Sequence, residues 1–208
     1  DIDVAYYFIH SLTSKDFMEK DKRLAKRFRQ IASDSDVDRV VYLSGISGSK
    51  NDNLSPHLKS RRDVEEILFE GEYDTTVLRA AVIIGKQSAS FRMIDDVTDR
   101  LPIMIVPKWV RTPSNPIWID DVVEYLIKVL EYKETRNNAY DIGCKEEWSY
   151  KRLIEETANI KNKKVRILPV PVMTPELSSY WLKFTTDVQY SIAKSLIKGM
   201  KNPVTVDS

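Results

Sequence analysis

The sequence predicts an α/β domain in which helices cover both faces of a parallel sheet. Residues 76–85 are almost all apolar, which indicates a strand buried on both faces. Segments of strand type and helix type alternate over residues 2–85, as in βαβ units with right-handed crossovers. The chain of 208 residues, 42% hydrophobic and 30% charged, is also long enough to bury a core of its own.

The first part of the chain supplies the sheet. Residues 2–9 and 39–44 have the composition of strands, and the run at 76–85 is the third strand. Residues 17–31 form a helix because Phe17, Leu24, Phe28 and Ile31 recur at helical spacing.

The two predicted helices differ in how they begin. Thr13 or Ser14 is the expected cap of the first helix. Its many Lys and Arg residues are interspersed with acids, which is typical of a solvated outer face. The second helix, residues 57–69, carries an apolar pattern that begins directly after an irregular segment.

In the second half of the chain, the predicted helices and strands are shorter and more often interrupted. Asp120 and Ser149 are expected to cap two of its helices, and Pro175 follows a capping Thr174. The expected elements are a short helix at 91–97, an extended segment at 101–106, strands at 117–119 and 140–143, helices at 121–130 and 149–160, an extended segment at 165–170, and two final helices from 174 to about 181–184 and from about 188 to 200. We expect residues 1–145 to form the sheet domain and residues 146–208 a smaller, α-rich region packed on it.

Composition excludes several classes of protein. Thirty-two basic and 31 acidic residues give a net charge of +1, so no overall field would attract nucleic acid or an anionic membrane. No segment approaches about 18 consecutive apolar residues, so no membrane span is expected. The single cysteine, Cys144, forms no internal disulfide, which favours a reducing compartment, the cytoplasm. One cysteine and two histidines leave too few ligands for a structural zinc site.

The chain begins with Asp1 and enters a strand at once. We therefore expect it to be the later part of a longer protein whose first strands lie upstream.

The glycines after the second strand do not form a phosphate-binding loop. Gly45 and Gly48 follow a strand, but the G-x-G-x-x-G spacing is missing and no helix opens directly after them. Lys50 stands one place too late for a P-loop. In open parallel sheets a dinucleotide loop belongs on the first strand–helix turn, which we expect upstream of Asp1.

The carboxyl ends of the predicted strands are the expected position of a ligand site. These ends carry His10 and Ser11, then Ser44 and Gly45, then residues 81–85. The alternative is that Ser11 and Ser44 only satisfy backbone groups where the strands end.

These segments together resemble atypical short-chain dehydrogenase/reductase proteins. The resemblance is to the NmrA-like and complex I accessory-subunit types, and to proteins described as nucleoside-diphosphate-sugar epimerase-like. The segments that carry it are residues 3–11, 39–45, 54–61, 78–85, 116–122 and 168–181. It covers nearly the whole chain, and the order of the motifs is more specific than any one of them.

The resemblance implies a Rossmann-like domain that binds NAD or NADP and an unknown small-molecule substrate. Working members of the family place a serine at the end of the fifth strand and a Tyr-x-x-x-Lys pair on the next helix. Ser44 matches the serine, while His57 and Arg61 stand at the positions of the tyrosine and the lysine. The implied catalytic residues are therefore Ser44, His57 and Arg61. The implied cofactor-binding residues are His10, Ser11, Gly45, Arg61, Ala81 and Ile84.

The two substitutions leave the activity open. Histidine titrates near neutrality and could move a proton, whereas arginine stays charged and can only hold a ribose or a phosphate. His57 could also contact a ligand without catalysis, or simply lie on a solvated helix face. The expected function is an NAD(P)-dependent oxidoreductase or epimerase-like protein. The alternatives are a non-catalytic NAD(P) sensor and an assembly or interaction protein, and a homodimer is possible. We expect residues 1–208 alone to bind the dinucleotide weakly or not at all, because helix N-terminal N–H groups for its pyrophosphate are missing.

Overall fold

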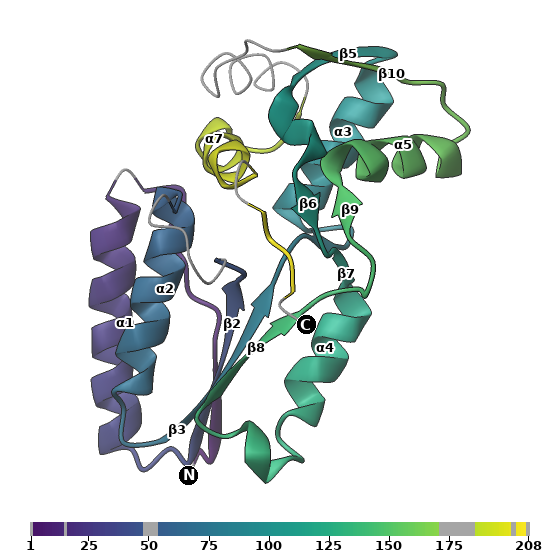
Figure 1. Cartoon of the computed structure of the whole chain (residues 1–208). Coiled ribbons are helices and arrows are strands. Elements are labelled where there is room, and N and C mark those ends of the chain that lie inside the picture. Colours follow the sequence, from purple (N-terminus) through teal and green to yellow (C-terminus); the bar gives the residue numbers. More distant parts are fainter. Residues whose placement is uncertain (1, 15, 48–53, 171–185, 201–202, 207–208) are drawn as a thin grey trace.

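Four parallel strands form the central sheet of the computed structural model, which describes residues 2–14, 16–47, 54–170, 186–200 and 203–206. The strands are β1 (Val4–Tyr7), β2 (Arg39–Gly45), β3 (Asp74–Ala80) and β8 (Asn138–Ile142), in the order β1-β2-β3-β8 (Figure 1). The prediction of an α/β domain with a parallel sheet is confirmed.

Helices cover both faces of this sheet, as predicted. On one face, α1 (Phe17–Asp34) and α2 (Pro56–Phe69) pack against alternate strand residues such as Val40. On the other face, α4 (Ile119–Lys128) packs against the intervening residues such as Val41. Because strand side chains alternate between faces, one apolar strand supplies two cores.

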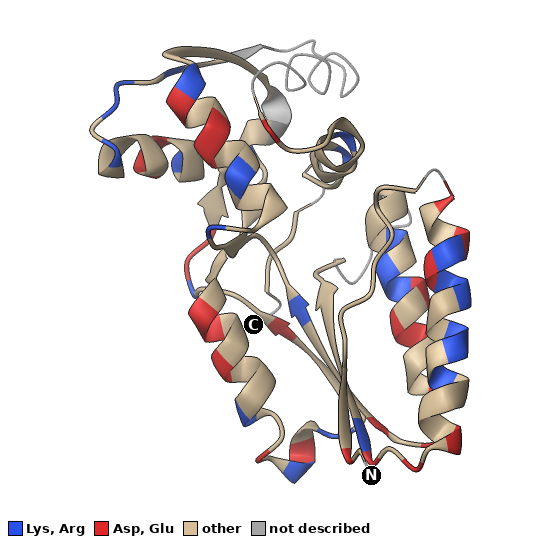
Figure 2. Ribbon diagram, turned by 180° about the vertical axis from the view of Figure 1, so that it is seen from behind, with Lys and Arg blue, Asp and Glu red and all other residues tan. Residues whose placement is uncertain are grey.

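Helix α1 follows the predicted pattern with two differences. Ile31, which the sequence places on the apolar stripe, is 54% exposed, and the neighbouring Ala32 is buried instead. The N-cap is Asp16 and makes no side-chain capping bond, so the prediction of Thr13 or Ser14 as the cap is wrong. Charges of both signs are interspersed along α1 (Figure 2), as predicted for a solvated face.

The third predicted strand is shorter than the apolar run. It ends at Ala80, which is the last residue with a partner on both neighbouring strands: Gly45 of β2 and Ile142 of β8. Beyond Ala80 neither β2 nor β8 provides a pairing partner, so the chain leaves the sheet. It resumes as β4 (Ile83–Ile84), which pairs with β7 (Ile117–Trp118).

A second lobe lies beyond the carboxyl ends of the strands (Figure 1). It contains α3 (Ala89–Arg100), α5 (Tyr150–Ile160) and α7 (Tyr190–Gly199), and the parallel pair β5 (Ile103–Pro107) and β10 (Arg166–Val170). The predicted helix that starts near residue 174 lies outside the described residues.

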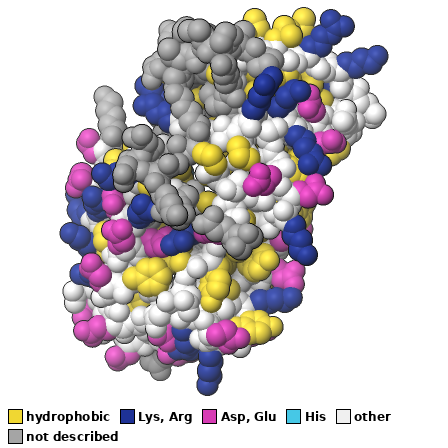
Figure 3. Space-filling model, in the orientation of Figure 1, with side chains coloured by type: hydrophobic (Ala, Val, Ile, Leu, Met, Phe, Trp, Pro, Cys, Tyr) yellow, Lys and Arg dark blue, Asp and Glu magenta, His cyan; other side chains and the backbone are white. Residues whose placement is uncertain are grey.

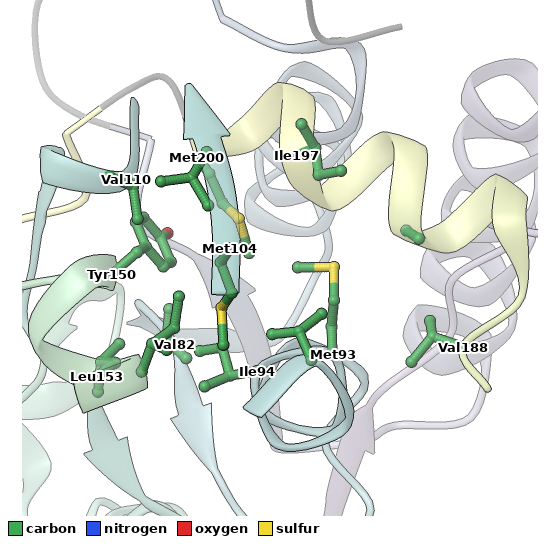
Figure 4. Packing of buried hydrophobic residues seen from close by; sticks show 14 residues of the cluster. Val82, Met93, Ile94, Met104, Val110, Tyr150, Leu153, Val188, Ile197 and Met200 are labelled. Carbon is green, nitrogen blue, oxygen red and sulfur yellow. The ribbon is translucent and has the colours of Figure 1, made fainter. Parts of the chain in front are cut away.

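One apolar core holds the second lobe together. Figure 4 shows Met104, Tyr150, Ile197 and Met200 among its members. The core combines residues from 82–110 with residues from 150–200. The lobe therefore draws on both sides of position 145, and the two-part division suggested by the sequence stays a prediction.

Two further predicted caps, Asp120 and Ser149, lie among the described residues. Ser149 caps α5 by accepting a hydrogen bond from the backbone N–H of Arg152, as predicted. Asp120 is not a cap, because α4 begins at Ile119 with Trp118 as the N-cap residue. The Asp120 carboxylate instead accepts a hydrogen bond from Trp118 Nε1 at 2.9 Å.

Among the described helices, none has the length and apolar character that crossing a bilayer requires.

Gly143 is a position where a side chain has no room. A Cβ there would lie 2.6 Å from the carbonyl oxygen of Asn115, a buried residue whose amide donates to Cys144 and Glu146. We expect Gly143→Ala to lower the free energy of unfolding by about 1–3 kcal/mol, the usual cost of overpacking. Urea denaturation measures the change. Gly199→Ala is the matched control, because its Cβ would meet Ser55 Oγ at an ordinary 3.7 Å. Equal stability of the two variants would contradict the prediction.

Candidate functional site

A cleft of about 450 Å³ lies where the carboxyl ends of β1, β2 and β3 meet. We refer to it as the strand-end cleft. Parallel strands all end at the same edge of a sheet, which is why residues distant in sequence come together there. Its lining residues are Phe8, His10, Leu43, Ser44, Gly45, His57, Arg61, Ala80, Ala81, Ile83, Ile119, Val122, Val123 and Leu126.

Helix α2 supplies two of the polar groups. Its N-cap is Ser55, whose hydroxyl accepts from the backbone N–H of Leu58, and Pro56 occupies the first turn. This fixed start sets the rotation of the helix. His57 and Arg61 are one helical turn apart, and both side chains line the cleft.

The environment of His57 keeps its imidazole neutral. Burial lowers the pKa of His57 to about 3, and the nearby Arg61 and His10 act in the same direction. The pKa of His10 is also lowered, first by desolvation and then by Arg61. At neutral pH both histidines are therefore uncharged, and Arg61 supplies the positive charge of the cleft.

Arg61 lies against Tyr42 of strand β2. Its Nη1 lies 3.5 Å from the Tyr42 hydroxyl, which in turn lies 3.5 Å from the carbonyl oxygen of Arg61. These long contacts orient the guanidinium without occupying its other donors. Burial raises the pKa of Tyr42, and Arg61 partly offsets this.

Ser44 lies two residues beyond Tyr42, on the same face of the strand. Its Oγ is buried and meets no described group in ordinary hydrogen-bond geometry, although it is close enough to Tyr42 to lower that phenol's pKa. A buried hydroxyl without a hydrogen-bond partner is costly unless a ligand or a water molecule supplies the missing hydrogen bond.

A buried carboxylate on α1 was missed by the prediction from sequence. Asp21 of α1 is 3% exposed and accepts a hydrogen bond from Ser60 of α2 at 3.2 Å. Its charge raises the pKa of both His10 and Tyr7. The signal was present: Asp21 stands four residues after Phe17, on the apolar stripe of the helix rather than among its solvated charges.

The structure places the predicted site residues in three groups. Most of them line the strand-end cleft: His10, Ser44, Gly45, His57, Arg61 and Ala81. Ser11 is buried beside the cleft, and its carbonyl accepts a turn hydrogen bond from Ser14. Ile84 lies in β4 and lines a different groove. Their roles remain predictions.

That other groove is larger, about 720 Å³, and lies between α4 and residues 143–148. Three of its charged lining residues form ion pairs: Lys128 pairs with Glu124, and Glu146 pairs with Arg152, which lies outside the lining. The strand-end cleft is smaller, but it contains two histidines with shifted pKa values, a charged arginine and a buried serine. Such a combination is typical of functional sites, so we take the cleft as the candidate site.

A second, small cavity of about 90 Å³ adjoins the cleft beneath α7. We refer to it as the α7 cavity. It shares Gly45, His57, Ala80 and Ala81 with the strand-end cleft. His57 therefore lies between the two spaces.

Comparison with known proteins identifies the fold. No family model and no curated protein matches the chain. Solved structures do match. One is a nucleoside-diphosphate-sugar epimerase from Staphylococcus aureus, with a TM-score of 0.73 and 16% identity over 99% of this chain and 69% of that one.

Two further matches come from Bacillus cereus. UDP-glucuronic acid 4-epimerase in complex with NAD has a TM-score of 0.64 and 16% identity, over 95% of this chain and 76% of that one. UDP-N-acetylglucosamine 4-epimerase has a TM-score of 0.66 and 15% identity over the same shares. The predicted Rossmann-like fold is therefore confirmed, and the resemblance to epimerase-like proteins holds at the level of the fold.

Proposed function

We propose that the protein binds NAD or NADP in the strand-end cleft and acts as an oxidoreductase or epimerase-like protein of the atypical short-chain dehydrogenase/reductase type. The observation that carries the proposal is the convergence of Ser44, His57 and Arg61, from two separate elements, on one cleft at the carboxyl ends of parallel strands. Structures of proteins with this fold contain NAD, among them the Bacillus cereus UDP-glucuronic acid 4-epimerase.

The residues present fit the nicotinamide ribose end of a dinucleotide. The buried Oγ of Ser44 needs a partner, and the Arg61 guanidinium has donors left after its contact with Tyr42. Ribose hydroxyls can accept hydrogen bonds from such donors. The apolar side chains of Ile119, Val122 and others form a wall against which the nicotinamide ring could pack. A bound nicotinamide would supply a hydride donor or acceptor.

The protein groups would polarise the substrate oxygen, and the proton that hydride transfer consumes or releases at this oxygen would be exchanged with water. A neutral imidazole can donate a hydrogen bond to a carbonyl oxygen, and the depressed pKa of His57 holds it in that form. The positive charge of Arg61 would stabilise negative charge that develops on the same oxygen.

The same observations also support a second candidate, a dinucleotide sensor without turnover. Tyrosine and lysine are replaced, and a histidine whose pKa is about 3 is a poor proton donor at neutral pH. Hydride transfer that is lost in His57→Ala would favour the enzyme. Tight NAD(P)H binding without hydride transfer to any carbonyl compound would favour the sensor.

A fluorescence titration of NADH and NADPH with the full-length protein tests the proposal. We expect saturable enhancement of the nicotinamide emission with at least one of the two, because the ring would enter an apolar cleft. No binding of either dinucleotide would overturn the proposal.

The location and assembly are part of the proposal. A reducing cytoplasmic environment suits the single thiol, Cys144, whose pKa is raised mainly by burial. We also retain a homodimer as a proposal, which sedimentation of the full-length protein would test.

A further inference from the structure

The α7 cavity has an apolar wall and few polar groups. Six aliphatic side chains supply most of the surface: Ile46, Leu58, Val82, Leu196, Met200 and Val204. The polar side chains around it are His57, Ser90 and Tyr150. Among the described residues that line it, none is a lysine or an arginine.

The position of the cavity fits the reacting end of a substrate. It opens against the same four residues that line the strand-end cleft, so a molecule in it would lie beside anything bound in the cleft. His57 is the only side chain with strong hydrogen-bonding capacity among these four residues, since the others are Gly45, Ala80 and Ala81. At the boundary with the cleft, an oxygen atom of a bound molecule would therefore face the imidazole.

The chemistry of the wall selects the class of ligand. A diphosphate has two negative charges that need cationic partners when they leave water, and the described wall offers none. Apolar surface, in contrast, gains free energy when it enters such a wall. The volume of about 90 Å³ admits a few non-hydrogen atoms, since cavities of about 150 Å³ hold a benzene ring.

We propose that the α7 cavity receives a small, mainly apolar alcohol or carbonyl compound whose oxygen faces His57, and not a nucleoside-diphosphate sugar. This inference rests on the proposed function, because it assigns the substrate side of the same site. It separates the protein from the structural neighbours that it resembles in fold, several of which act on sugar nucleotides.

Two substitutions in α7 provide a matched pair. Gly199 lines the cavity, and among the described residues a Cβ at this position would meet only Ser55 Oγ, at 3.7 Å. Gly199→Ala therefore adds a methyl group at a lining position without strain, and alanine is the better helix former. Ser195 lies on the same helix outside the lining, and its hydroxyl donates to the carbonyl of Ser191. Ser195→Ala is the control.

The experiment measures ligand binding rather than turnover. Butanone and UDP-glucose are titrated separately into the full-length protein, and binding is followed by saturation-transfer NMR of the ligand methyl or anomeric signals. We expect butanone to bind the wild type and Ser195→Ala equally, and about tenfold more weakly to Gly199→Ala, the scale of one misplaced methyl group in a pocket. UDP-glucose should not compete with butanone.

The possible failures can be distinguished. Displacement of butanone by UDP-glucose, absence of butanone binding, or equal butanone affinity in Gly199→Ala and the wild type would each overturn the inference. A parallel NADH titration of both variants should match the wild type, because Gly199 and Ser195 lie outside the strand-end cleft. Loss of NADH binding already in the wild type would overturn the proposed function, whereas normal NADH binding with failure of the butanone test would overturn only the assignment of the substrate class.

Discussion

Replacing His57 with glutamine is expected to make the fold much less sensitive to acid. The pKa of His57 is about 3 in the folded protein, below the ordinary 6.5 of an unfolded chain. The unfolded state therefore binds more protons between these two values. The stability associated with a neutral His57 is fully present above pH 6.5 and is lost as the pH falls toward 3, by up to about 1.4 kcal/mol per pH unit.

Urea unfolding at pH 8 and at pH 5 measures this effect. Glutamine does not titrate, so the loss of stability between the two conditions should be smaller in His57→Gln than in the wild type. His10→Gln is the control, since it removes the protein's other histidine, which is exposed, and should change the slope less. An identical loss of stability in the wild type and in His57→Gln would show that the imidazole is not desolvated in the folded state.

Arg61→Ala is expected to weaken NAD(P)H binding by about tenfold or more, the usual value of a hydrogen bond made by a charged group. The guanidinium is the only charged side chain among the described residues that line the strand-end cleft, given that both histidines are neutral there. The NADH titration measures the loss.

Two further variants make that result specific. Arg61→Lys keeps the charge but not the forked geometry, so it should fall between the wild type and the alanine variant. Lys59→Ala removes a charge from the same helix outside the cleft and should leave the affinity unchanged. Unchanged affinity in Arg61→Ala would remove Arg61 from the cofactor site.

The fold could be predicted because its main signals are local. Continuous apolar strands predict burial on both faces, and helical spacing locates α1 and α2. The end of β3 at Ala80 could not be predicted, because the apolar run continues to Gly85 while the pairing partners on β2 and β8 stop. The length of a strand depends on its neighbours as well as on its own residues.

Part of the candidate site could also be predicted from the sequence. Ser44 ends the predicted second strand, and the spacing of His57 and Arg61 places them on one helix face, so sequence alone indicates both elements. Asp21 was missed because an acid within a run of charges suggests solvent, although its helical position points inward. The α7 cavity could not be predicted, because it forms where the last described helix meets Gly45, Ile46, His57 and Leu58.

A crystal structure of the full-length protein with bound NAD or NADP tests the central claim most directly. The account predicts the nicotinamide and its ribose in the strand-end cleft, within contact of Ser44, His57 and Arg61, with the ring edge toward the α7 cavity. A dinucleotide bound instead in the larger groove between α4 and residues 143–148, or one that leaves these three side chains untouched, would contradict it.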